Sequence, residues 1–101
     1  MKVVVSEDAR QHALAVDTWW REHRTAAPEL FLAELASALE LLEALPLAGQ
    51  LYDHPTLDGV RRVLLRATRY HVYYRVRDDA VVVLAVWSAV RGAGPDLERM
   101  S

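Results

Sequence analysis

The side chains most able to bind a charged partner gather in the C-terminal half of this 101-residue chain. Between Val60 and Arg77 there are six arginines and no carboxylate. Guanidinium groups bind phosphate and carboxylate groups bidentately, and His71, in the same stretch, titrates near neutral pH. The segment could therefore bind a polyanion or an acidic protein. The alternative is a solvated strand surface that is basic by chance.

Charge is divided unevenly between the two halves of the chain. Residues 1–59 contain four basic and ten acidic side chains, whereas residues 60–101 contain eight arginines and four carboxylates. The formal net charge of −2 therefore conceals an acidic part of −6 and a basic part of +4. This asymmetry indicates a basic face rather than an evenly mixed surface.

Other kinds of chemical site have little support. The chain has no cysteine, so disulfides, cysteine-based zinc sites and cysteine nucleophiles are excluded. It contains no phosphate-binding glycine loop and no dinucleotide motif. His12, His23 and His54 lack metal-ligand spacing and are expected at the surface, while Asp53 and Asp58 lie in turn-rich sequence, where Asp bonds to the backbone. We expect no metal and no cofactor.

Length and hydropathy predict one domain, residues 1–101, in the cytoplasm. The longest apolar run, Ala80–Trp87, has eight residues, whereas a membrane-spanning helix needs roughly 20. The N-terminal segment turns acidic at Glu7, before an apolar secretory signal could form. We therefore expect neither a signal peptide nor a membrane partner.

Local patterns predict the elements that position these residues. Residues 2–5 predict a short strand, and Ser6 is a good N-cap for a helix to about His23, with Trp20 in its buried stripe and Trp19 at its edge. Pro28 in its first turn and Pro46 at its end delimit a second helix. After a loop over residues 46–59, alternating patterns predict strands at residues 60–67, 70–77 and 80–88, and then an irregular tail.

The predicted fold class is α+β. It consists of an N-terminal strand, an antiparallel helix hairpin and a three-stranded antiparallel meander, with the helices packed on one face of a mainly antiparallel four-stranded sheet. Alternation in the middle strand places Tyr70 and Tyr74 on the helix face. The opposite face is then an open polar surface that carries His71, Tyr73, Arg75 and Arg77, with Arg62 and Arg66 beside them.

Motifs along nearly the whole chain resemble those of one family. They are Ala9 with Trp19-Trp20, Ala27–Phe31, Leu45-Pro46 with Gly49, Gly59–Leu65, Tyr70–Val76, Val81–Trp87 and Arg91. In this order, and in a chain of this length, they resemble the RelE/ParE toxin superfamily. The resemblance implies the toxin half of a type II toxin–antitoxin pair, neutralised by a small antitoxin whose acidic-amphipathic tail folds as it binds.

The superfamily contains two kinds of activity. Its RelE-like members are ribosome-dependent mRNA endonucleases. By resemblance to them, this chain retains basic residues of their pattern at Arg62 and Arg91, and His71 stands where they have an arginine. Leu64 replaces a second basic residue and Leu97 replaces a tail aromatic, so cations and donors that cleavage needs are missing. The ParE branch, whose members inhibit DNA gyrase by binding it, is therefore favoured over an enzyme.

Two alternatives remain open beside a gyrase inhibitor. One is an mRNA endonuclease that uses Arg62, His71 and Arg91 on the ribosome, and the other is a relic that binds only the antitoxin. Arg61 is expected near the helix side or an edge, paired with a helix glutamate. The residues predicted to contact the target or the antitoxin are Trp19, Arg62, Arg66, Tyr73, Arg75, Arg77 and Arg91, although Tyr73 could instead pack beneath arginine side chains.

Overall fold

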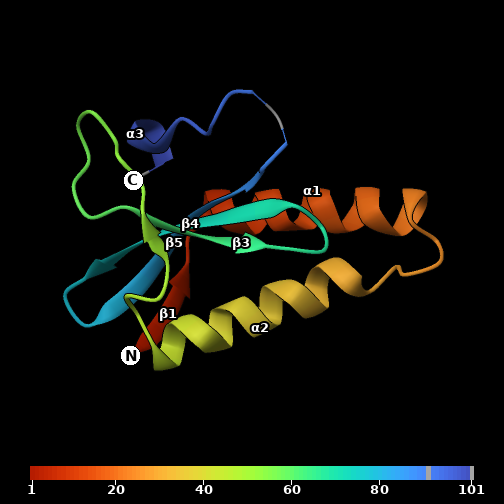
Figure 1. Ribbon diagram of the computed structural model, residues 1–101, viewed down its shortest axis with the longest axis horizontal. Helices are drawn as coiled ribbons and strands as arrows, with labels where there is room; N and C mark the ends of the chain where they lie inside the picture. Colours follow the sequence, from red (N-terminus) through yellow and green to blue (C-terminus); the bar gives the residue numbers. More distant parts are fainter. Residues whose placement is uncertain (91, 101) are drawn as a thin grey trace.

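A five-stranded sheet and a helix hairpin organise the protein (Figure 1). The computed structural model describes residues 1–90 and 92–100. Its elements are β1 (Lys2–Val5), α1 (Glu7–His23), α2 (Leu30–Ala44), β2 (Gln50–Leu51), β3 (Arg61–Leu65), β4 (Tyr70–Arg77), β5 (Ala80–Ser88) and α3 (Leu97–Met100). The α+β class and the order of the predicted elements are confirmed.

The strands lie in the order β1-β5-β4-β3-β2. β1 pairs with β5 in parallel, and every other pairing is antiparallel. The prediction of four strands was wrong by one, because β2 lies within the segment expected to be a loop and pairs with Arg61 and Arg62. Two residues are too few to show an alternating pattern, so β2 gave no signal in the sequence.

Helix α1 begins where the sequence predicts. The Ser6 hydroxyl oxygen accepts a hydrogen bond from the Ala9 amide at 3.1 Å, and Glu7 and Asp8 occupy the first turn. The hydroxyl satisfies a backbone amide that would otherwise be unpaired, and the two carboxylates interact favourably with the positive end of the helix dipole. Trp20 is buried, as expected for a residue of the inward stripe.

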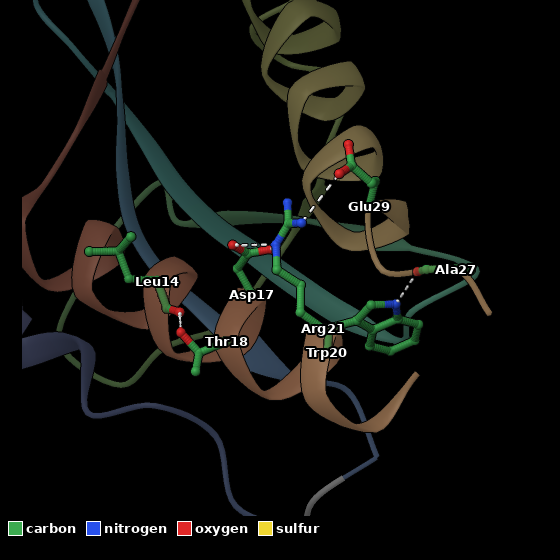
Figure 2. Close-up of polar contacts among 7 residues, drawn as sticks. All are labelled: Leu14, Asp17, Thr18, Trp20, Arg21, Ala27 and Glu29. Carbon is green, nitrogen blue, oxygen red and sulfur yellow. Dashed lines mark hydrogen bonds and ion pairs between the residues drawn. The ribbon is translucent and has the colours of Figure 1, made fainter. Parts of the chain in front are cut away.

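The connection between the two helices is fixed by side chains at the end of α1 (Figure 2). The Trp20 indole N–H donates to the Ala27 carbonyl oxygen at 2.8 Å. The Arg21 guanidinium lies between Asp17, one turn earlier, and Glu29, the residue before α2. Pro28 lies in the turn before α2 and not, as expected, in its first helical turn.

The main core lies between the helix hairpin and one face of the sheet. Phe31, Leu42 and Tyr74 are fully buried there, and the Phe31 and Tyr70 rings meet edge to face at 5.5 Å between centroids. A carboxylate from α2 also holds the turn between β3 and β4. Glu34 accepts hydrogen bonds from the Ala67 amide and from both the amide and the hydroxyl of Thr68, at 2.6 to 2.9 Å. The hairpin and the meander are therefore joined by apolar packing and by this polar contact.

A β-bulge in β5 supplies residues to both faces of the sheet. Tyr73 pairs with Ala85 but Tyr74 pairs with Val83, which leaves Leu84 as the additional residue. Because a bulge shifts the alternation by one residue, Val83 and Val86 pack in the main core while Leu84 and Ala85 both lie on the opposite face.

The opposite face, which we call the second face, is only partly open. The loop before β3 and helix α3 cover one half of it, and Figure 1 shows them side by side. Leu97 of α3 is fully buried against Val60, Tyr73 and Leu84. The expectation of an entirely open polar face was wrong, because the predicted irregular tail folds back onto this half of the sheet and buries apolar surface there.

Among residues 1–90 and 92–100, none of the helices is long and apolar enough to cross a lipid bilayer.

Candidate functional site

The covered half of the second face holds a cluster of aromatic and basic side chains. The Arg62 guanidinium lies 4.9 Å from the Tyr52 ring centroid and 5.9 Å from that of Tyr73, and its Nη1 donates to the Tyr73 hydroxyl oxygen at 3.3 Å. The two tyrosine rings meet edge to face at 5.0 Å. A guanidinium held over aromatic faces and by a hydroxyl has a fixed orientation.

Tyr73 is not available as a contact for a partner. Only 2% of it is exposed, because Tyr52 and Leu97 cover it and Arg62 lies over its ring. This corrects the prediction of Tyr73 as a target- or antitoxin-binding residue and matches the alternative, packing beneath an arginine. Tyr52 itself was missed, since an isolated aromatic residue in a loop has no periodic pattern.

His71 joins this cluster from the same face of β4. Its ring meets the Tyr73 ring edge to face at 5.8 Å. Burial, followed by the positive charges of Arg62 and Arg69, lowers the pKa of His71 below its ordinary value. The imidazole is therefore neutral at pH 7 and able to accept a proton.

Two positions of the nuclease pattern are occupied by leucine in this structure. Leu64 lies directly opposite His71 in the β3–β4 register, so an apolar side chain occupies the position where the nuclease pattern has a basic residue. Leu97, which replaces the tail aromatic, is buried in the second face. Arg91, the remaining candidate for catalysis and for binding, lies outside the described residues. Among the described residues, Arg62 and His71 thus provide a cation and a proton acceptor, and Arg69 adds positive charge near His71.

The open half of the second face is basic around a small apolar centre. On one side of β5, Arg75 of β4 pairs with Val82 and Arg77 with Ala80. On the other side, Val4 and Lys2 of β1 pair with the same two residues. Cross-strand neighbours share a face, so these side chains form one surface, in which Val4 is 43% exposed. We call Lys2, Arg75 and Arg77, with Val4 and Val82 between them, the basic strip.

The cations of the basic strip have no partner within the described part of the chain. The side chains of Lys2, Arg75 and Arg77 form no hydrogen bond or ion pair with another of these residues, whereas those of Arg10 and Arg21 on α1 are paired with neighbouring carboxylates. Three unpaired cations around apolar side chains can bind an acidic segment through charge-assisted hydrogen bonds and contact with its apolar residues.

Arg66 does not belong to this surface. It follows β3 at the turn into β4 and borders a shallow groove beside α2, whereas Arg77 lies at the far end of β4. The eight residues of β4 separate the two ends by about 25 Å at the rise of an extended strand. The expectation that Arg66 lies beside Arg75 and Arg77 was therefore wrong.

Trp19 lies on the helix side of the sheet and is 40% exposed. Its ring stacks on His23 at 4.6 Å between centroids, and the Arg24 guanidinium lies 5.0 Å from it. It borders a cleft of about 520 Å³ between α1 and the end of β5, together with His12 and Trp87. Trp19 is thus accessible, as expected, but on the opposite side of the sheet from the basic strip.

Three further side chains have structural contacts. His12, expected at the surface, is half-buried and accepts a hydrogen bond from the Val86 amide. His54 accepts from two amides of its own loop, those of Thr56 and Leu57. Arg61 donates to the carbonyl oxygens of Leu47 and Gly49 and not, as expected, to a helix glutamate.

Metal-ligating side chains do not gather anywhere in the described chain, where no three residues of the type His, Cys, Asp or Glu are placed to hold one ion.

Comparison with known proteins identifies the family. A family model described as the ParE toxin of the type II toxin–antitoxin system parDE matches residues 3–91. No curated protein sequence matches the chain. A solved structure described as a chromosomal ParDE TA system from P. aeruginosa matches with a TM-score of 0.69 and 16% identity, over 87% of this chain and 95% of that one. The fold is shared, the resemblance seen in the sequence is confirmed, and the chain belongs to the ParE toxin family of type II toxin–antitoxin systems.

Proposed function

We propose that this ParE-family chain is a toxin that inhibits DNA gyrase by binding it, and that a cognate antitoxin neutralises it by covering the basic strip. Both interactions take place in the cytoplasm and need no cofactor. Family membership supports the toxin role. The observation that carries the antitoxin surface is that the side chains of Lys2, Arg75 and Arg77 surround the exposed Val4 and have no partner among the described residues.

Binding is favoured over cleavage by the composition of the Arg62 cluster. Cleavage of RNA requires stabilisation of the negative charge that develops on the phosphate, and each lost donor typically costs about 3 kcal/mol of transition-state stabilisation. Leu64 faces His71, and the Arg62 guanidinium is already engaged with Tyr73. With leucine at position 64 and Arg62 already engaged, the described part of the cluster is poorly suited to this chemistry.

One observation supports the second candidate, a ribosome-dependent mRNA endonuclease that uses Arg62, His71 and Arg91. Arg62 and His71 do lie in one cluster, and the lowered pKa of His71 leaves its imidazole neutral and able to accept the 2′-hydroxyl proton. His71→Ala separates the two candidates. A nuclease that depends on this base should lose about 100-fold or more in activity, whereas a gyrase inhibitor should be almost unaffected.

The target is tested by expressing the chain without its antitoxin and following thymidine and methionine incorporation over the first minutes. Under the gyrase proposal, thymidine incorporation falls first in both the wild type and His71→Ala, and the purified chain inhibits supercoiling by gyrase. An early fall in methionine incorporation that His71→Ala abolishes would instead establish the endonuclease. If neither incorporation changes while folded protein accumulates, the chain is inactive on both targets and retains at most antitoxin binding.

The antitoxin surface is tested by charge reversal, with a matched control. Arg75→Glu should weaken binding of the antitoxin and flatten its salt dependence, because charge-assisted contacts are lost. Arg66→Glu makes the same change in net charge at an exposed position outside the basic strip and should leave binding almost unchanged. If both variants weaken antitoxin binding equally, or if neither variant weakens it, docking on the basic strip is contradicted.

A further inference from the structure

Strand β5 extends beyond the strand that borders it. β1 pairs with β5 only as far as Val5 and Val83, so Leu84–Ser88 has no strand on its outer side in the described part of the chain. Helix α1 packs against β5 in its place. An uncovered strand edge leaves backbone groups unpaired and exposes the strand to pairing with another chain.

Three hydrogen bonds join Ser6 and the second turn of α1 to β5, at the end of its pairing with β1 and beyond it. The Ser6 amide donates to the Val83 carbonyl oxygen at 3.0 Å, and the Ser6 hydroxyl donates to the Leu84 carbonyl oxygen at 3.3 Å. The third bond runs in the opposite direction, from the Val86 amide to His12 Nδ1 at 3.2 Å. Of the three, only the bond to His12 depends on a group that titrates.

The chemistry of that bond fixes the state of the ring. An imidazole nitrogen accepts a hydrogen bond only when it carries no proton, so His12 is neutral with its proton on Nε2. The doubly protonated ring donates from both nitrogens and cannot accept from Val86. His12 also meets the Trp87 ring edge to face at 5.3 Å and borders the cleft between α1 and β5, so its position affects both the strand edge and the cleft.

We propose that His12 is a proton-operated latch between α1 and the outer edge of β5. While the ring is neutral the latch holds the Val86 amide. When Nδ1 takes up a proton, the bond is lost, α1 loosens from residues Leu84–Ser88 and the cleft beside Trp19 and Trp87 widens.

The groups around His12 set the direction of the pH response. Burial lowers the pKa of His12, and the Asp8 carboxylate, one turn earlier on α1, partly opposes this by raising it. β5 has no ionisable side chain between Leu84 and Ser88, and from β4 only the Tyr70 phenol borders the same cleft. The folded protein thus binds this proton less readily than the unfolded chain. The stability that the latch contributes is complete above about pH 6.5 and is lost as the pH falls from there through the pKa of His12 in the folded protein.

The experiment follows the Val86 amide in the wild type and in two variants. His12→Asn keeps an acceptor near the position of Nδ1 but cannot titrate, and His12→Phe keeps an aromatic ring but has no acceptor. Amide hydrogen exchange measured by NMR gives a protection factor for Val86 at each pH. The amides of Val72 and Val81, buried in the main core, serve as internal references that show whether each variant is folded.

The latch predicts three different pH profiles. In the wild type, protection of the Val86 amide falls by up to about tenfold per pH unit as the pH decreases from about 6.5 to the pKa of His12 in the folded protein, because the opened chain takes up the proton more readily than the closed one. In His12→Asn it is independent of pH, and in His12→Phe it is low throughout. His23→Asn, an exposed site on the same helix, should behave as the wild type.

Either of two results would overturn the proposal. One is a Val86 amide in His12→Phe that is protected as in the wild type while Val72 and Val81 show an intact core. The other is a pH response in His12→Asn equal to that of the wild type. Neither result would bear on the gyrase proposal, which does not depend on this edge.

Discussion

The contact between Gly49 and Tyr74 offers the sharpest test of how the loop before β3 is held. The Tyr74 hydroxyl oxygen accepts a hydrogen bond from the Gly49 amide at 2.9 Å, and Tyr74 is fully buried. The Gly49 carbonyl oxygen accepts from Arg61 Nη1 at 2.8 Å. These bonds fix the segment that leads into β2 and Tyr52, and thereby position the ring on which Arg62 lies.

We predict that Gly49→Ala destabilises the protein strongly. The new Cβ would lie 2.7 Å from both Cε1 and the hydroxyl oxygen of Tyr74 and 3.0 Å from the Arg62 carbonyl oxygen. Overpacking of this kind costs about 1–3 kcal/mol, and a buried amide that loses its acceptor adds about 1–3 kcal/mol. We expect a total near 3 kcal/mol, which corresponds to a decrease in Tm of about 12–24 °C for a domain of this size.

The measurement is urea unfolding of the wild type, Gly49→Ala, Tyr74→Phe and the double variant. Tyr74→Phe should cost about 1–2 kcal/mol, because the Gly49 amide loses its acceptor. In the double variant the costs should add incompletely, by about 1 kcal/mol, since the hydrogen bond and one close contact can be lost only once. The control is Gly92→Ala, whose new Cβ meets nothing within 4 Å and should change stability by less than about 0.5 kcal/mol.

Two outcomes would refute this reasoning. If Gly49→Ala unfolds at the same urea concentration as the wild type, the loop does not pack on Tyr74 as described. If the two single changes add fully, they act at independent sites and the hydrogen bond between them contributes nothing.

The remaining predictions concern the two contacts that hold the helix hairpin. Burial raises the pKa of Glu34, but hydrogen bonds from the Thr68 hydroxyl and the Ala67 and Thr68 amides outweigh this effect, so the pKa is lowered. The stability that the ionised carboxylate contributes is therefore present above about pH 4.5 and is lost as the pH falls through the pKa of Glu34 in the folded protein. Glu34→Gln should therefore be less stable than the wild type in urea at about pH 7 and approach it at about pH 3, and an equal difference at both would contradict the role of the charge. Trp20→Phe should cost about 1–2 kcal/mol in thermal unfolding because the Ala27 carbonyl loses its donor, while Arg21→Ala, at an exposed ion pair, should cost less than about 1 kcal/mol; the reverse order would show that the ion pairs fix the connection.

The sequence by itself determined the features that depend on near neighbours. The Ser6 cap bonds to an amide three residues away, and the alternation of β4 places Tyr74 in the main core and Tyr73 on the other face. Such patterns fix the identity and approximate bounds of helices and long strands because their causes lie within a few residues. The ordered motifs also sufficed to indicate the family, which the match over residues 3–91 confirmed.

Only the tertiary structure decided which parts of the polar surface stay open. Burial of Leu97 and Tyr73 depends on a tail that folds back over β5, and the bond between His12 and the Val86 amide joins residues 74 positions apart. The same holds for Arg66, whose place beside α2 depends on where the β3–β4 turn lies against that helix. Contacts between distant segments follow from the packing of the whole chain and leave no periodic trace in the sequence. The basic strip was consequently narrower than the run of arginines suggested.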